Sequence, residues 1–138
     1  MADEAVCIET PTRFARYTIA AGAILPFGTL MKLTGDFTVE ASDSADDPFV
    51  GIVWERASTA TSTHTEITLA QDGVWDIKDS SAGQTLGEAT ALAGANLTAT
   101  ADAADFLNGA FMGYIEEAPA ASEVVRTRLT KFGGSGKL

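Results

Sequence analysis

Residues that could act as a nucleophile, a general base or a metal ligand are few in this sequence. It has one histidine, His64, and one cysteine, Cys7, which stand 57 positions apart. A Ser-His-Asp or Cys-His hydrolase needs a base within hydrogen-bond reach of its nucleophile, and zinc sites use paired ligands at short spacing. His64 lies on the expected solvent face of an alternating strand, without a nucleophile-elbow or catalytic-cysteine signature. We therefore predict a surface histidine, a small apolar cysteine and no zinc site.

Acidic side chains are the remaining candidates for chemistry. Asp43, Asp46 and Asp47 could offer oxygen ligands to calcium, but the alternating ligands, central glycine and distal glutamate of an EF-hand loop are absent. Glu116 and Glu117 adjoin an expected strand end, where neighbouring side chains face opposite ways and cannot act as an acid/base pair. We predict solvated carboxylates at both places. The chain is thus expected to be no enzyme and to hold no metal or cofactor.

Size and charge narrow the function further. With 138 residues, 46% of them hydrophobic, the chain can form one domain with a real core. Nineteen acidic and nine basic residues give a net charge of −10, which disfavours direct binding to nucleic acid or to an anionic membrane. The apolar runs fall short of the roughly 20 residues of a membrane-spanning helix, and the acidic start lacks the features of a secretory signal. We expect synthesis in the cytoplasm.

The elements that must position these residues are mostly strands. Residues 29–33 and 37–41 flank Thr34-Gly35-Asp36 and are expected to form a hairpin with one solvent-exposed face. Residues 49–54, an unbroken apolar run, predict a core strand that is covered on both faces. A second hairpin is predicted from residues 64–69 and 74–78 around Asp72-Gly73.

The rest of the chain is less regular. Residues 80–105, rich in Ala, Gly and Thr, predict irregular loops with too little bulk to dominate a core, and a short helix near residues 101–107. Residues 110–116 and 123–131 predict two closing strands across an Ala-Pro-Ala turn.

These elements predict a mainly β, compact single-domain fold of the β-barrel or β-tulip-like type, with at most one or two short helices. Residues 1–13 lack periodicity and predict an extended N-terminal arm with no place in the core. Residues 14–132 form the β-rich domain, and residues 133–138 a flexible C-terminal tail.

Three segments carry a resemblance to a known family. Residues 25–33 (Leu-Pro-Phe-Gly-Thr-Leu-Met-Lys-Leu) look like a proline-led first hairpin strand, and residues 49–53 (Phe-Val-Gly-Ile-Val) like a Val-Gly-Ile core strand. Residues 61–68, followed by Asp72-Gly73-Val74-Trp75, look like a threonine-rich strand with its turn glycine and aromatic residue. In this order and spacing, the chain from residue 25 to residue 78 resembles the head decoration proteins of lambda-like tailed phages.

The resemblance implies a capsid decoration, or cement, protein. Three copies would sit around local threefold axes on the outer surface of the expanded head and join neighbouring capsomers. The partners would be the major capsid protein and two further copies of the chain, in a homotrimer that stabilises the virion. The segment after residue 78 has no counterpart that can be aligned residue by residue.

A physical mechanism for such binding uses the N-terminal arm. An extended segment can add its backbone to an exposed sheet edge on the capsid, and three arms on one trimer would act multivalently. The expected capsid-contact residues are Val6, Ile8, Thr10, Pro11 and Arg13. Deletion of residues 1–13 is expected to leave the fold intact and to weaken particle binding. Simple terminal disorder is the alternative.

Two other functions stay open. The first is a small virion-associated carbohydrate- or receptor-binding β-domain that uses Trp54, Trp75 or Tyr114 as an aromatic platform, although packing of both tryptophans in one core is the simpler expectation. The second is a hydrolase with two converging carboxylates, which no residue pair in the sequence guarantees.

Overall fold

The computed structural model describes residues 4–20, 23–45, 47–54, 65–80, 84–117 and 124–131. The elements formed by these residues are, in chain order, β1 (Val6–Glu9), β2 (Phe14–Thr18), β3 (Leu30–Gly35), β4 (Thr38–Ala41), β5 (Phe49–Val53), β6 (Glu66–Ala70), β7 (Val74–Asp79), β8 (Ala89–Gly94), β9 (Leu97–Thr100), α1 (Ala103–Asn108), β10 (Phe111–Glu117) and β11 (Val124–Leu129).

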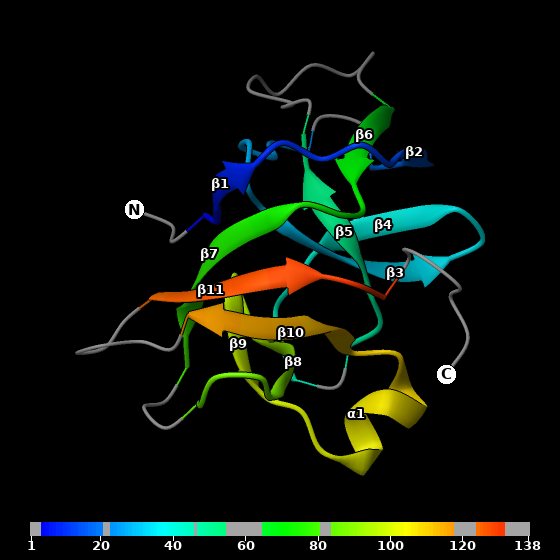
Figure 1. Cartoon of the computed structure of the whole chain (residues 1–138). Helices are drawn as coiled ribbons and strands as arrows, with labels where there is room; N and C mark the ends of the chain where they lie inside the picture. The colour runs from blue at the N-terminus through cyan, green and yellow to red at the C-terminus, as the bar shows by residue number, and fades with distance from the viewer. Residues whose placement is uncertain are drawn as a thin grey trace.

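The predicted fold class is confirmed. The chain is mainly β, and strands β2 to β6 close into a barrel in the order β2-β4-β3-β5-β6. A six-stranded sheet of order β1-β7-β11-β10-β8-β9 packs against the barrel, and the short helix α1 lies at the far end of this sheet (Figure 1). In the part of the chain that the structure describes, no helix is long and apolar enough to cross a membrane.

Strands β2–β6 and strands β7–β11 have the same connectivity. In the first set, β2 pairs in parallel with β4 and antiparallel with β6, β3 pairs with β4 and β5, and β5 pairs with β6. In the second set, β7 pairs in parallel with β9 and antiparallel with β11, β8 pairs with β9 and β10, and β10 pairs with β11. The domain is therefore built from two copies of one five-strand arrangement, which we call the N-terminal unit (β2–β6) and the C-terminal unit (β7–β11).

Hydrogen bonds between backbone atoms recur at equivalent places in the two units. The Leu33 N–H donates to the Pro48 carbonyl at 3.0 Å, and the Leu92 N–H donates to the Ala110 carbonyl at 2.9 Å. Leu33 and Leu92 are 59 positions apart and precede a bulge in the β3–β4 and the β8–β9 pairing, respectively. The repeat thus extends from strand order to individual backbone contacts.

The interiors of the two units differ in polarity. The barrel interior is an apolar cluster that includes Ile19, Leu25, Met31 and Val39. The equivalent positions of the C-terminal unit carry buried polar residues: Asp79, Gln84, Thr90 and Thr98. Gln84 Nε2 donates to Asp79 Oδ1 at 2.9 Å, and Thr90 Oγ1 donates to Gln84 Oε1 at 2.7 Å. A buried polar group costs little when it is hydrogen-bonded, so this network replaces an apolar core locally.

The second predicted hairpin is wrong in its pairing, although both of its strands exist. β6 pairs with β2 and β5 inside the barrel, whereas β7 pairs with β1, β9 and β11 in the other sheet. Asp72-Gly73 is consequently the link between the two units and not a hairpin turn. The buried face of β6, with Ile67 and Leu69, is as predicted.

The first hairpin and the core strand are confirmed. β3 and β4 pair antiparallel, and all five residues of β5 are buried. The turn is formed by residues 36–37 and not by residues 34–36 as predicted, because Phe37 leaves the strand with a φ of 51° and its side chain is 74% exposed.

Residues 80–105 are more regular than the sequence indicates. They contribute the paired strands β8 and β9, and Ala91 and Leu92 of β8 join the core between the two units. The predicted short helix is confirmed as α1, and the two closing strands as the antiparallel pair β10 and β11. The Ala-Pro-Ala turn and the C-terminal tail, residues 133–138, lie outside the described residues.

Candidate interaction surface

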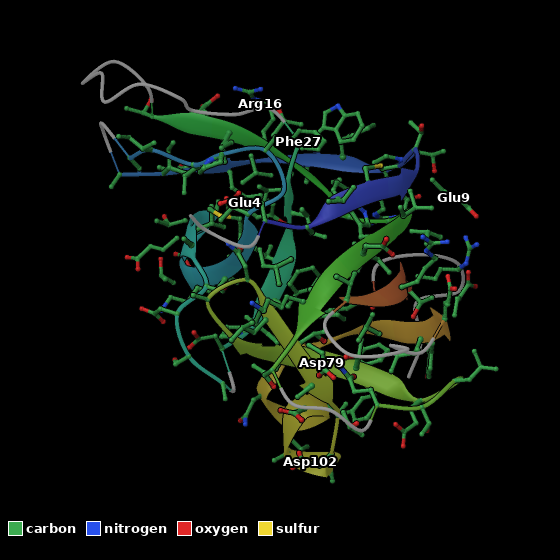
Figure 2. All side chains as sticks on the ribbon, turned by 90° about the vertical axis from the view of Figure 1, so that its left-hand side faces the viewer. Glu4, Glu9, Arg16, Phe27, Asp79 and Asp102 are labelled. Carbon is green, nitrogen blue, oxygen red and sulfur yellow. The ribbon has the colours of Figure 1, made fainter. Side chains whose placement is uncertain are left out.

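β1 forms one edge of the six-stranded sheet. It pairs antiparallel with β7, with Val6 opposite Asp76 and Cys7 opposite Trp75. Figure 2 shows Glu4 and Glu9 at the two ends of β1, and β7 running from this edge toward Asp79. Among the described strands, none pairs with the other side of β1. An open strand edge is a template on which a further strand can add.

The expectation that residues 1–13 have no place in the core is wrong for the residues that can be described. Ala5 is buried in the core cluster, and its N–H donates to the Gly28 carbonyl at 2.9 Å. Cys7 packs against the same cluster, and burial raises the pKa of its thiol, which fits a small apolar residue. The arm is extended as predicted, but long-range pairing with β7 draws it onto the domain.

A carboxylate fixes the end of the arm. Asp72 Oδ1 accepts hydrogen bonds from the Thr12 and Arg13 N–H groups at 2.7 and 2.9 Å, and Asp72 Oδ2 accepts one from Thr12 Oγ1 at 2.6 Å. Partial burial alone would raise the pKa of Asp72, but these hydrogen bonds outweigh it and lower the pKa below 3.8. We call this arrangement the Asp72 anchor.

The five predicted contact residues are therefore not equivalent. Val6 is 59% exposed, and Ile8 and Thr10 are also exposed, so these three can meet a partner. Pro11 is buried and cannot do so without movement. Arg13 is exposed at its side chain, which donates to Gln71 Oε1, while its backbone belongs to the Asp72 anchor.

A row of arginine–glutamate ion pairs crosses the sheet beside β1. Arg128 of β11 donates to both carboxylate oxygens of Glu9 at 3.2 Å and to Glu116 Oε2 at 2.7 Å. The hydrogen bond from Arg128 lowers the pKa of Glu116. Glu116 lies in a bulge of β10 and Glu117 follows it; both are exposed, and Glu117 pairs with a different arginine, Arg126, at 3.2 Å. These carboxylates hold arginines and do not converge on a common point.

In its described residues, the acidic loop considered as a calcium site does not form a metal site either. Lys32 Nζ lies 2.7 Å from Asp43 and 3.5 Å from Asp47, so an ammonium group occupies the position expected for a cation. Within the described ranges, no group of three or more His, Cys, Asp or Glu residues could hold a metal ion. Asp46 and His64 lie outside those ranges.

The proposed aromatic platform is not assembled as a surface. Trp75 is fully buried, and its ring meets the half-buried Trp54 edge-on at a centroid distance of 6.3 Å, as expected for one core. Tyr114 instead contacts Phe111, on β10. Sequence reasoning missed two exposed rings that do lie beside Trp54: Phe14 at the start of β2 and Phe27, with centroid distances of 5.5 and 5.1 Å.

Comparison with known proteins adds no family assignment. No protein-family model matches the chain, and no curated protein matches it.

Proposed function

We propose that this chain is a capsid decoration protein, which binds the outer surface of the expanded head of a tailed phage as a homotrimer at local threefold axes and stabilises it. The observation that carries the proposal is β1, an apolar edge strand with one open side on a strongly acidic protein. The ordered sequence resemblance between residues 25 and 78 supports the same function and names the major capsid protein as partner.

The chemistry of the surface suits a binding role without catalysis. Backbone addition to β1 supplies hydrogen bonds from main-chain groups, and the outward side chains of Val6 and Ile8 supply apolar contact. Each arm would bind weakly, yet three arms engaged together can raise the avidity by roughly 10² to 10⁴. Binding to the expanded head alone then stabilises that state by mass action.

The test is to mix the purified protein with undecorated expanded heads, to sediment them, and to count the copies bound per capsid subunit. We expect saturation near one copy per subunit and density at threefold positions by electron microscopy. Absence of saturable binding to any such shell would reject the proposal.

A point variant tests the arm better than deletion does, because deletion would remove Ala5 from the core and uncover β7. Val6→Asp places a charge on the open edge strand, whereas Val124→Asp makes the same change at a residue of β11 that is 47% exposed. We expect Val6→Asp to weaken head binding at least tenfold, about 1.4 kcal/mol, and Val124→Asp to leave it unchanged. Equal binding by both variants would remove β1 from the contact surface.

A further inference from the structure

The two repeated units differ at one strand edge. In the C-terminal unit, β9 pairs with β7 at Lys78, and β1 pairs with the earlier part of β7, from Val74 to Asp76. In the N-terminal unit, β4 pairs with β2 at Thr18, the position equivalent to Lys78. No strand in the described part of the chain lies on this side of β2 at Phe14 or Ala15, where the counterpart of β1 would be.

Side chains at equivalent positions of β7 and β2 also differ in their exposure to solvent. Val74, beside which β1 lies, is 1% exposed, whereas Phe14, at the equivalent position of β2, is 43% exposed. An aromatic side chain next to an open strand edge invites pairing with another strand, and folded proteins usually cover or charge such an edge. Among the described residues, the N-terminal unit thus has no counterpart of β1 at this edge.

We propose that this edge of β2 accepts β1 of a second copy of this chain. β1 already fits the equivalent edge of β7 in length, direction and register. Arg13 and Arg16 lie at the β2 edge, but Arg16 already pairs with Glu66 at 3.3 Å and Glu9 of the arm with Arg128 at 3.2 Å. The fit of β1 to the repeated edge, and not charge, therefore selects the occupant. Transfer of β1 from its own β7 to β2 of the next copy uncovers the donor's β7 edge, joins the copies head to tail and can close into a ring.

The Asp72 anchor determines how β1 can move. It holds Thr12 and Arg13, so β1 pivots at Thr10 and Pro11 while β2 stays in place. The same anchor opposes folding of β1 onto β2 of its own chain, because a hairpin across residues 10–13 would break these hydrogen bonds. The β2 edge therefore receives its strand from another molecule.

The exchange rests on the proposed function, because it requires many copies close together, as on a decorated capsid. Intrachain pairing with β7 benefits from a high effective concentration, on the order of millimolar, and only a comparable density of second copies competes with it. A shared capsid surface supplies such a density. In dilute solution the intrachain pairing prevails.

Disulfide trapping tests the exchange. By equivalence with the Val6 and Asp76 pair, Val6 of the donor lies opposite Arg16 of the acceptor. In a Cys7→Ser background, oxidation of the Val6→Cys, Arg16→Cys variant at high protein concentration should give covalent dimers and larger species. A matched control is Val6→Cys, Leu107→Cys, because Leu107 is exposed on α1 at the other end of the molecule.

We expect the first variant to form dimers about tenfold faster than the control, since pairing raises the local thiol concentration. Equal rates would overturn the proposal. So would an intrachain disulfide between positions 6 and 16, seen as a monomer without free thiols.

A locked variant separates this proposal from the proposed function. Oxidised Val6→Cys, Asp76→Cys, also with Cys7→Ser, fixes β1 on its own β7. The locked form keeps the open edge of β1 but cannot join neighbouring copies, so we expect it to bind expanded heads at least tenfold more weakly than its reduced form, through loss of multivalent contact. Equal binding of both forms would overturn the exchange while decoration stands. Binding of neither form would overturn decoration, and the trapping rates would then decide the exchange alone.

Discussion

Gly28 and Gly87 stand at the same point of the two units, 59 positions apart in the chain. Their φ angles are 93° and 84°, and their N–H groups donate to the Val53 and Ile115 carbonyls at 2.9 Å in both cases. They differ in their surroundings. A Cβ atom on Gly28 would lie 2.3 Å from the Ala5 carbonyl oxygen, whereas a Cβ atom on Gly87 would meet nothing within 4 Å.

This difference predicts unequal effects of the same substitution. Gly28→Ala and Gly87→Ala each force a side chain into a left-handed conformation, at a cost of about 1 kcal/mol. Gly28→Ala adds a clash that displaces the start of β1, for a total loss of about 3 kcal/mol. Urea unfolding of both variants measures the two losses. Similar losses would mean that the arm does not pack on the Gly28 turn in solution.

The repeat could have been inferred from glycine spacing. Gly35 and Gly94 are 59 positions apart, and Gly51 and Gly113 are 62 apart, each pair in equivalent strands. Strands β8 and β9 of the C-terminal unit are not predicted, because hydrophobic patterning follows the interior, and this interior is partly polar. Thr98, for example, stands where the barrel has Val39, so β9 lacks an apolar alternation.

The errors in strand pairing have a different cause. Asp72-Gly73 has the residue types of a tight turn, but the Asp72 carboxylate binds Thr12 and Arg13, about 60 positions earlier. The sequence predicts the arm outside the core for a similar reason, since long-range contacts with β7 and Gly28 place Ala5 in the core. Local patterns predicted most strands and the fold class, and long-range contacts decided which strands meet.

Phe37 and Asn96 occupy equivalent turn positions, with φ angles of 51° and 58°, and are expected to respond in opposite directions. Phe37→Asn replaces an exposed bulky residue by one that tolerates this conformation, and should stabilise the fold by up to about 1 kcal/mol. Asn96→Ala should destabilise it by about 2 kcal/mol, because the buried Leu30 N–H donates to Asn96 Oδ1 at 2.8 Å. Thermal unfolding of both variants is the measurement. A loss of stability in Phe37→Asn would contradict the strain argument.

The Asp72 anchor predicts that the free energy of unfolding decreases at acid pH. Because the pKa of Asp72 is lowered in the folded state, the anchor contributes fully above the unfolded value, near 3.8, and its contribution is lost as the pH falls through the lower folded pKa. Asp72→Ala should cost about 1–2 kcal/mol at pH 7 and flatten this acid dependence. Asp36→Ala, at the exposed β3–β4 turn, is the control. Parallel acid-unfolding curves for wild type and Asp72→Ala would refute the anchor.

Lys131 predicts a second rise of stability with pH, in the alkaline range. Its Nζ donates to the Phe49 carbonyl at 2.8 Å and to the Gly109 carbonyl, and thereby ties β11 to β5 and to the end of α1. Burial lowers the pKa of Lys131 from 10.5 to about 8. Between these values the unfolded chain binds more protons than the folded chain, so stability should rise with pH, by about 2–3 kcal/mol from this residue.

The neutral amine keeps two N–H donors, so deprotonation removes the buried charge without breaking either contact. The measurement is denaturant unfolding from pH 7 to pH 10 for the wild type and for Lys131→Met, because the difference between the two curves cancels the other titrating groups. We expect the stability of the wild type to gain on that of the variant as the pH rises through 8. A constant difference would show that Lys131 is not desolvated in the folded protein.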